Sequence, residues 1–260
     1  MLDRATTHLQ PSVSIGRVLV VLPAYNEEQG LELLLGRMKR TFELINRDYE
    51  IIVVNDASKD RTEEVATEAS EHMNVLVRNH EVNQGLSGAI ETGLRTAVNL
   101  AEEQDVIISM DADDTHNPGS MQQMLMMIEE GHDIVIASRY QAGAKTLGVP
   151  LKRRFLPIFG RMLFRTLCPI PGVRDYTCGF RAYKVKPLRD AMEAYGQDFF
   201  SEKGFSCMVD ILLKMRKFNP ICGEVPMVLR YDQKHGASKM DVGSTIVTTL
   251  KLLLKRRFGK

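Results

Sequence analysis

Three aspartates within four positions form the group of side chains best suited to chemistry. Asp111, Asp113 and Asp114 directly follow the apolar run DVIISM at residues 105–110. In an extended backbone the carboxylates of Asp111 and Asp113 point to the same side, where they repel each other unless a cation lies between them. Such oxygen ligands suit Mg²⁺ or Mn²⁺ shared with substrate phosphates. The pattern predicts a metal site for a phosphate-bearing substrate; the alternative is a solvated acidic turn or a helix N-cap before Pro118.

The aspartates need a scaffold, and the chain supplies one by alternating two periods. Continuous apolar runs are typical of strands covered on both faces, and they occur at residues 17–22, 50–55, 74–77, 105–110 and 133–138. Helical spacing of apolar residues occurs at 27–45, 62–70, 86–102 and 118–131. This alternation predicts an α/β fold with a mostly parallel, Rossmann-like sheet flanked by helices.

The carboxyl ends of the predicted strands are where a ligand should bind, because parallel sheets bind ligands beyond those ends. Four polar segments follow strands in this way: 23–28, 56–60, 111–116 and 139–143. We therefore expect the three aspartates to share one site with the other three segments.

The second half of the chain is less regular. It predicts a helix at 151–167 broken by Pro157 and Gly160, and then a loop and strand at 175–185. A helix at 205–218, a strand at 221–231, a polar loop at 232–240 and a last helix at 241–258 follow. No linker or repeat interrupts the chain, so we expect an N-terminal tail at 1–16 and a single domain at 17–258.

Composition excludes several classes of protein. A formal net charge of +1 on 260 residues gives no global attraction to nucleic acid. The four cysteines lack zinc-finger or CxxC spacing, which predicts buried thiols in a reducing compartment. Neither a signal peptide nor an apolar run of membrane-spanning length is visible, so we expect a cytoplasmic protein. Leucines mixed with Lys and Arg at 155–167 and 246–260 suit either a peripheral membrane contact or ordinary amphipathic packing.

Five segments in this order resemble the family 2 glycosyltransferases of the GT-A fold: LPAYNEE, VVNDASKDRT, NQGLSGAIETG, ISMDADDTHNP and ASRY. The second half narrows the resemblance to the dolichyl- or polyprenyl-phosphate mannose and glucose synthases, through LKRRF, DYTCGFRAY, GEVPM and HGASKM. The resemblance covers residues 17 to 258. It implies a nucleotide-sugar-binding half at 17–138 and an acceptor-side half with C-terminal helices at 139–258.

The resemblance also implies the donor site. The residues expected to contact the nucleotide-sugar are Pro23, Ala24, Tyr25, Glu27, Asp56, Gly85, Asp111 and Ala112. Asp111 and Asp113 would hold Mg²⁺ or Mn²⁺ at the diphosphate. For Tyr25 and Glu27 a second interpretation is the start of a helix capped by Asn26, with Gln29 three residues on. Gly85 would let the backbone approach the ribose, or would only permit tight helix packing.

The acceptor side calls for cations, because a lipid monophosphate is largely ionised at neutral pH and needs no base. The cations proposed for its phosphate are Arg139, Arg153, Arg154 and Lys239; a solvated helix face is the alternative for residues 152–154. Asp175 is expected to contact sugar or acceptor, or to act as a base if the acceptor is a hydroxyl. The alternative for Asp175 is a structural salt bridge to Arg181 or Arg174.

Two positions depart from the family pattern. Thr115 stands where the family often has Gln, which predicts a metal site that relies more on Asp113 and water, with Asp114 as a candidate helper. Gln233 stands where an Arg is usual, so contact from the loop at 232–240 to phosphate must come from other residues. His116 is a candidate metal ligand, or a residue that packs the loop.

The leading hypothesis is an inverting hexosyltransferase whose catalytic residues are Asp113, Asp175 and Arg139. It would move mannose from GDP-mannose to polyprenyl phosphate. A family 2 transferase with a hydroxyl acceptor, and a non-catalytic nucleotide-binding module, are the alternatives. The chain has no Trp, so it lacks the QxxRW motif of processive polysaccharide synthases.

Overall fold

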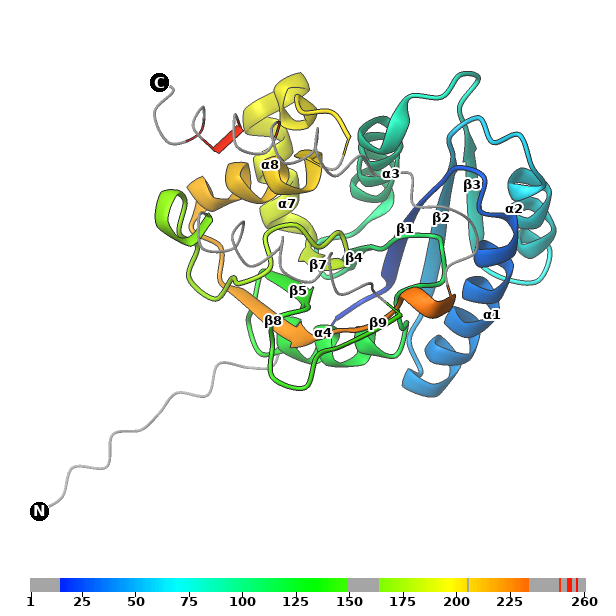
Figure 1. The fold of residues 1–260 in the computed structure, drawn as a ribbon, viewed down its shortest axis with the longest axis horizontal. Coiled ribbons are helices and arrows are strands. Elements are labelled where there is room, and N and C mark those ends of the chain that lie inside the picture. The colour runs from blue at the N-terminus through cyan, green and yellow to red at the C-terminus, as the bar shows by residue number, and fades with distance from the viewer. Residues whose placement is uncertain are drawn as a thin grey trace, which may run out of the picture.

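The predicted alternation folds as a seven-stranded sheet with the strand order β3-β2-β1-β4-β7-β5-β8 (Figure 1). The computed structural model describes residues 15–148, 164–204, 206–233, 248, 252, 253 and 256. The strands of the sheet are β1 (Val18–Ala24), β2 (Tyr49–Asn55), β3 (Val75–Asn79), β4 (Val106–Ser109), β5 (Ile134–Ser138), β7 (Arg181–Lys184) and β8 (Cys222–Pro226). A second, two-stranded parallel sheet pairs β6 (Lys145–Leu147) with β9 (Val228–Arg230).

Helices cover both faces of the large sheet. They are α1 (Glu28–Ile45), α2 (Thr62–Ser70), α3 (Gly85–Leu100), α4 (Ser120–Glu129), α7 (Val185–Tyr195) and α8 (Ser206–Met215). Short 3₁₀ turns lie at Gly196–Phe200, Arg216–Phe218 and Tyr231–Gln233. In Figure 1, α3, α7 and α8 lie above the strands and α4 lies below them. This two-sided cover explains why the strands read as continuous apolar runs, since residues 18–22 and 51–54 are completely buried.

The strand β7 is the feature that the sequence did not place. It lies between β4 and β5 and runs antiparallel to both, pairing Ala182 with Ile108 on one side and with Val135 on the other. All other pairings in the large sheet are parallel. The prediction of a mostly parallel α/β sheet is therefore confirmed, and one strand from the second half of the chain completes its centre.

Two predicted boundaries were wrong. The first strand does not end at Pro23: it continues to Ala24, whose carbonyl accepts the amide of Asp56. Backbone groups alternate sides along a strand, so the nitrogen of Pro23 faces the side where β4 has already ended, and no ladder bond is lost. The strand predicted at 221–231 divides into β8 and β9, because Met227 leaves the large sheet.

The helix α7 was not predicted, although its signal is present in the sequence. Val185, Leu188, Ala191 and Met192 are buried and follow helical spacing. Pro187 falls within the first turn, where a missing amide costs little. The helix packs on α3 and α8 on one side of the sheet.

All four cysteines are free, buried thiols, which confirms the prediction of burial. Burial raises the pKa of Cys178, Cys207 and Cys222 to about 12. Thiols of this kind remain protonated and unreactive at neutral pH.

Few residues near the C-terminus are described. Leu252 and Leu253 are buried, which favours packing over membrane contact for these two leucines. The guanidinium of Arg256 donates two 2.8 Å contacts to the buried carboxylate of Asp210, and this carboxylate also contacts Lys214 at 2.5 Å. In the part of the chain that the structure describes, no helix combines the length and the apolar character that crossing a membrane requires.

Candidate active site

The loops that follow β1 and β2 hold each other in place. The amide of Asn26 donates to Ser58 Oγ at 3.0 Å, and Asn26 Oδ1 accepts from the amide of Lys59 at 2.7 Å. Thr62 Oγ1 accepts from the amide of Glu27 at 2.8 Å. Asn26 has a left-handed backbone (φ 51°), and α1 begins at Glu28 without a side-chain cap. The predicted N-cap role of Asn26 is therefore wrong; Asn26 joins two loops instead.

The expected donor-binding residues of the first loop lie at this junction. Ala24 is buried, whereas Pro23, Tyr25 and Glu27 are partly exposed. All four lie at the carboxyl end of β1, directly beside the end of β2. The structure thus brings the first two predicted segments together at one edge of the sheet.

Asp56 links β2 to the start of α3. Its carboxylate accepts the amides of Gln84 and Gly85, both at 2.8 Å, and contacts His80 Nδ1 at 2.7 Å. The negative charge lies at the N-terminus of a helix, where it is stabilised. Gly85 has a φ of 74° and opens the helix, a backbone conformation that suits glycine. Asp56 is only 2% exposed. A hydrogen bond from the nucleobase of a donor must therefore go to a lone pair of the Asp56 carboxylate that these contacts leave.

The loop after β4 places the two predicted metal ligands in different surroundings. The side chain of Asp111 is 44% exposed, while Ala112 and Asp113 are buried. Asp113 Oδ1 accepts the hydroxyl of Thr115 at 2.7 Å. A Cβ at Gly30 of α1 would lie 3.0 Å from the backbone of Asp113, so the helix packs directly against this loop. The helix and the hydroxyl therefore fix Asp113, and Asp111 faces outward.

Asp114 has a structural partner. Its carboxylate forms a 2.8 Å ion pair with Arg37 of α1, and its side chain is 5% exposed. The backbone of Asp114 is left-handed (φ 56°), a conformation that Asp tolerates better than most residues. This arrangement ties the third aspartate to α1.

His116 is a buried neighbour of Asp111. It is 4% exposed and stacks on Phe180, with ring centroids 5.4 Å apart. Its Nε2 lies 3.9 Å from Asp111 Oδ2, too far for a hydrogen bond. Its Nδ1 has no hydrogen-bond partner among the described residues.

Asp111 and Asp113 suit a cation that brings ligands of its own. Within the described ranges, no three His, Cys, Asp or Glu side chains converge as a metal-binding group. Two carboxylates without a third acidic or imidazole ligand suit Mg²⁺ or Mn²⁺, which retain water and take substrate phosphate oxygens as ligands. The donor set fits a metal bound together with a diphosphate.

Arg139 and Asp175 form the second half of the site. Asp175 is completely buried and accepts from the backbone N, Nε and Nη2 of Arg139 at 3.1, 2.8 and 2.7 Å. Burial alone would raise the pKa of Asp175, but the charge and hydrogen bonds of Arg139 outweigh it and hold that pKa below its usual range. Such a carboxylate is a poor general base.

Asp175 does have the structural salt bridge that was considered for it, but with another partner. The guanidinium of Arg181 donates instead to the backbone carbonyls of Met208 and Tyr176, and that of Arg174 donates to Gln141. The partner of Asp175 is Arg139, the residue also proposed from the sequence for the acceptor phosphate.

The remaining proposed cations, Arg153, Arg154 and Lys239, lie outside the described residues, as do residues 234–240 of the predicted polar loop. One contributor that the sequence did not single out is Glu224 of β8, which accepts the amides of Arg174 and Asp175 at 2.6 and 2.7 Å. No spacing rule points to it, since it lies 49 residues from Asp175.

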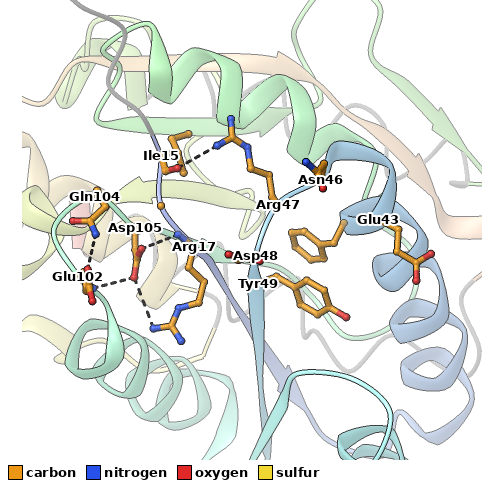
Figure 2. A pocket seen from close by; sticks show the side chains of 12 residues that line it. Ile15, Arg17, Glu43, Asn46, Arg47, Asp48, Tyr49, Glu102, Gln104 and Asp105 are labelled. Carbon is orange, nitrogen blue, oxygen red and sulfur yellow. Dashed lines mark hydrogen bonds and ion pairs between the residues drawn. The ribbon is translucent and has the colours of Figure 1, made fainter.

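A separate cavity of about 780 Å³ lies at the amino ends of the parallel strands, where β1, β2 and β4 begin (Figure 2). Its arginines are paired within the protein: Arg17 with Glu50 at 2.7 Å, and Arg47 with Glu129. The loops at the carboxyl ends of the strands combine a partly exposed and a buried carboxylate with an arginine fixed by Asp175, so they are the candidate active site.

Comparison with known proteins confirms the fold and defines the class of protein as a glycosyltransferase of the GT-A fold. Residues 19–191 match the family model described as glycosyl transferase family 2. The chain belongs to that family.

Two relatives extend this result beyond the matched region. The chain is 32% identical to an undecaprenyl-phosphate mannosyltransferase of Micrococcus luteus, over 93% of this chain and 96% of that protein. It is 34% identical to a dolichol-phosphate mannosyltransferase of Pyrococcus furiosus, over 90% of this chain and 62% of that protein. Among solved structures, glucosyl-3-phosphoglycerate synthase of Mycobacterium tuberculosis with Mn²⁺ and UDP is similar in fold (TM-score 0.63, 18% identity, 94% and 80% of the two chains).

The contact between Thr115 and Asp113 gives a test of the metal site. Replacing Thr115 by Val keeps the shape of this buried side chain and removes the hydroxyl that orients Asp113. We expect Mn²⁺ affinity in the presence of GDP to fall about tenfold, as for other groups that orient a ligand. Titration of Mn²⁺ followed by electron paramagnetic resonance measures it. Unchanged affinity would show that the hydroxyl does not orient a metal ligand.

Proposed function

We propose that the protein transfers mannose from GDP-mannose to a polyprenyl phosphate, with inversion at the anomeric carbon. The names of the two relatives support this donor sugar and this class of acceptor. The observation that carries the proposal is the pairing of Arg139 with the buried carboxylate of Asp175. The pair supplies a fixed cation for a phosphate, while its carboxylate is engaged and is a poor general base.

In this proposal each part of the site has one task. The β1 loop (Pro23, Ala24, Tyr25, Glu27), Asp56 and Gly85 hold the nucleoside, and Asp111, Ala112 and Asp113 hold the diphosphate end. Mg²⁺ or Mn²⁺, when bound to Asp111 and Asp113, offsets charge on the leaving diphosphate. Arg139 positions the lipid phosphate, with Arg153, Arg154 and Lys239 as further candidates. Asp175 holds Arg139.

The acceptor chemistry follows from the charge of the lipid phosphate. With a second pKa of about 6, it is ionised at neutral pH, and one of its oxygens attacks the anomeric carbon while the bond to GDP breaks. A hydroxyl acceptor would need a general base, and Asp175 is engaged by Arg139 and kept ionised. A phosphate acceptor is therefore favoured over a hydroxyl. Because the acceptor is a membrane lipid, we propose peripheral contact with the cytoplasmic face of a membrane.

The test uses acceptors that differ only by the phosphate. The protein is incubated with Mn²⁺, radiolabelled GDP-mannose, UDP-glucose or GDP-glucose, and either polyprenyl phosphate or polyprenol. We expect label from GDP-mannose to enter the organic phase with polyprenyl phosphate alone. Equal labelling of polyprenol would contradict the acceptor, and labelling from another donor would contradict the sugar. A further arm replaces the lipid by 3-phosphoglycerate, because the solved structure of similar fold is a glucosyl-3-phosphoglycerate synthase.

A further inference from the structure

Glu224 is a buried carboxylate whose hydrogen bonds end at the acceptor side of the site. It lies on β8 opposite Ile136 of β5 and is 7% exposed. Its Oε1 accepts two backbone amides, those of Arg174 at 2.6 Å and Asp175 at 2.7 Å. A buried carboxylate is costly unless it is hydrogen-bonded, so these two short contacts are its main compensation.

The same residue also joins the loop that carries Arg139. The backbone carbonyl of Glu224 accepts from Gln141 Nε2 at 3.4 Å, and Gln141 Oε1 accepts from Arg174 Nη1 at 3.1 Å. The loop after β5 and the segment before β7 are thereby both attached to one position on β8. A shift of Glu224 would move both segments.

From these contacts we propose that Glu224 is a positioning residue for the acceptor phosphate, an inference that rests on the proposed function. It fixes the backbone of Asp175; the carboxylate of Asp175 in turn accepts from Nε and Nη2 of Arg139 at 2.8 and 2.7 Å. Displacement of a positioning group by about 1 Å can lower a rate by about 10²-fold. Glu224 therefore sets where Arg139 meets the phosphate, without touching it.

The contacts also specify which property of Glu224 is used. Both partners of Oε1 are neutral amides, and within the described residues no Lys or Arg side chain forms an ion pair with this carboxylate. Its Oε2 has no hydrogen-bond partner there. The function thus needs an acceptor oxygen at this place and not a negative charge, so Gln should replace Glu, whereas Met, of similar length but without an acceptor, should not.

The experiment compares Glu224→Gln, Glu224→Met and Arg139→Ala in steady-state transfer from GDP-mannose to polyprenyl phosphate, with the thermal midpoint of each variant. Asp133→Leu serves as the matched structural control. Asp133 accepts the amide of Ile221 at 2.8 Å at the other end of β8, away from the site. We expect Glu224→Met to raise the KM for the lipid phosphate about tenfold and to leave Mn²⁺-dependent GDP affinity unchanged. Glu224→Gln should stay within about threefold of the unsubstituted protein.

The outcomes separate this inference from the proposed function. Combining Glu224→Met with Arg139→Ala should add little to Arg139→Ala alone, because residues in one chain of contacts are not additive. A raised KM in Arg139→Ala but not in Glu224→Met overturns the role of Glu224 alone. No rise in Arg139→Ala overturns the acceptor role of Arg139, and the inference falls with it. Equal effects of Glu224→Met and Asp133→Leu would show a merely structural role. If Glu224→Met does not fold, Glu224→Asp should show the same pattern with a smaller rise.

Discussion

Asp113→Asn is expected to lower kcat for sugar transfer about 10³-fold and to abolish the stimulation of GDP binding by Mn²⁺. The substitution keeps the size of the side chain and removes one of two carboxylate charges at the proposed diphosphate end. A metal contributes several kcal/mol to the stabilisation of charge in such a transition state, and each 1.4 kcal/mol or so corresponds to about tenfold in rate. Single-turnover kinetics at saturating GDP-mannose, with and without Mn²⁺, measures the loss.

The neighbouring aspartate supplies the control. Asp114 is also buried and one residue away, but its carboxylate contacts Arg37 of α1 at 2.8 Å. Asp114→Asn should lower the thermal midpoint and leave the Mn²⁺ dependence of transfer unchanged. If both variants lost turnover equally, the charge of the whole loop would matter, and the assignment of the metal to Asp111 and Asp113 would fail.

The elements of the first half of the chain could be predicted from the local pattern of apolar residues. The strands β1 to β5 and the helices α1 to α4 lie within about two residues of the expected ranges, because each is a run of one period between polar breaks. The strand β7 could not be placed in this way. It has four residues, and its neighbours β4 and β5 lie more than 40 residues earlier. Which gap in a sheet a short strand fills is decided by packing over the whole domain.

In the candidate site, too, local features could be predicted from the sequence and long-range contacts could not. Asp111 and Asp113 are visible in the sequence because they follow an apolar run at a spacing of two. Arg139 and Asp175 could each be selected as charged residues near strand ends, but their pairing spans 36 residues, and the sequence favoured other partners for Asp175. Contacts made through backbone amides, such as those of Glu224, leave no trace in residue type.

Asp175→Asn is expected to lower the free energy of unfolding by about 3–5 kcal/mol, the cost of removing one partner of a buried ion pair. Asp175 is completely buried and the side chain of Arg139 is 27% exposed. Little water can therefore solvate the face of the guanidinium that loses its carboxylate partner. Urea denaturation at pH 7 measures the loss. The exposed pair of Arg230 and Asp232, at 2.9 Å, provides the control, because an exposed pair contributes little to stability; Asp232→Asn should leave the urea midpoint close to that of the unsubstituted protein.

The same pair predicts how stability depends on pH. Arg139 holds the pKa of Asp175 below its usual range despite burial, whereas an unfolded Asp titrates near about 3.9. When the pKa of an Asp is lower in the folded state, its charge stabilises the fold fully at pH values above the pKa of the unfolded state. This contribution is lost as the pH falls through the pKa of the folded state. The pKa of Arg139 is raised, so the arginine stays charged throughout. The difference in free energy of unfolding between the unsubstituted protein and Asp175→Asn should therefore be constant from pH 7 to about 5 and shrink below about pH 4. A difference that persisted unchanged at pH 3 would require that the stabilisation come from packing of Asp175, independent of its charge.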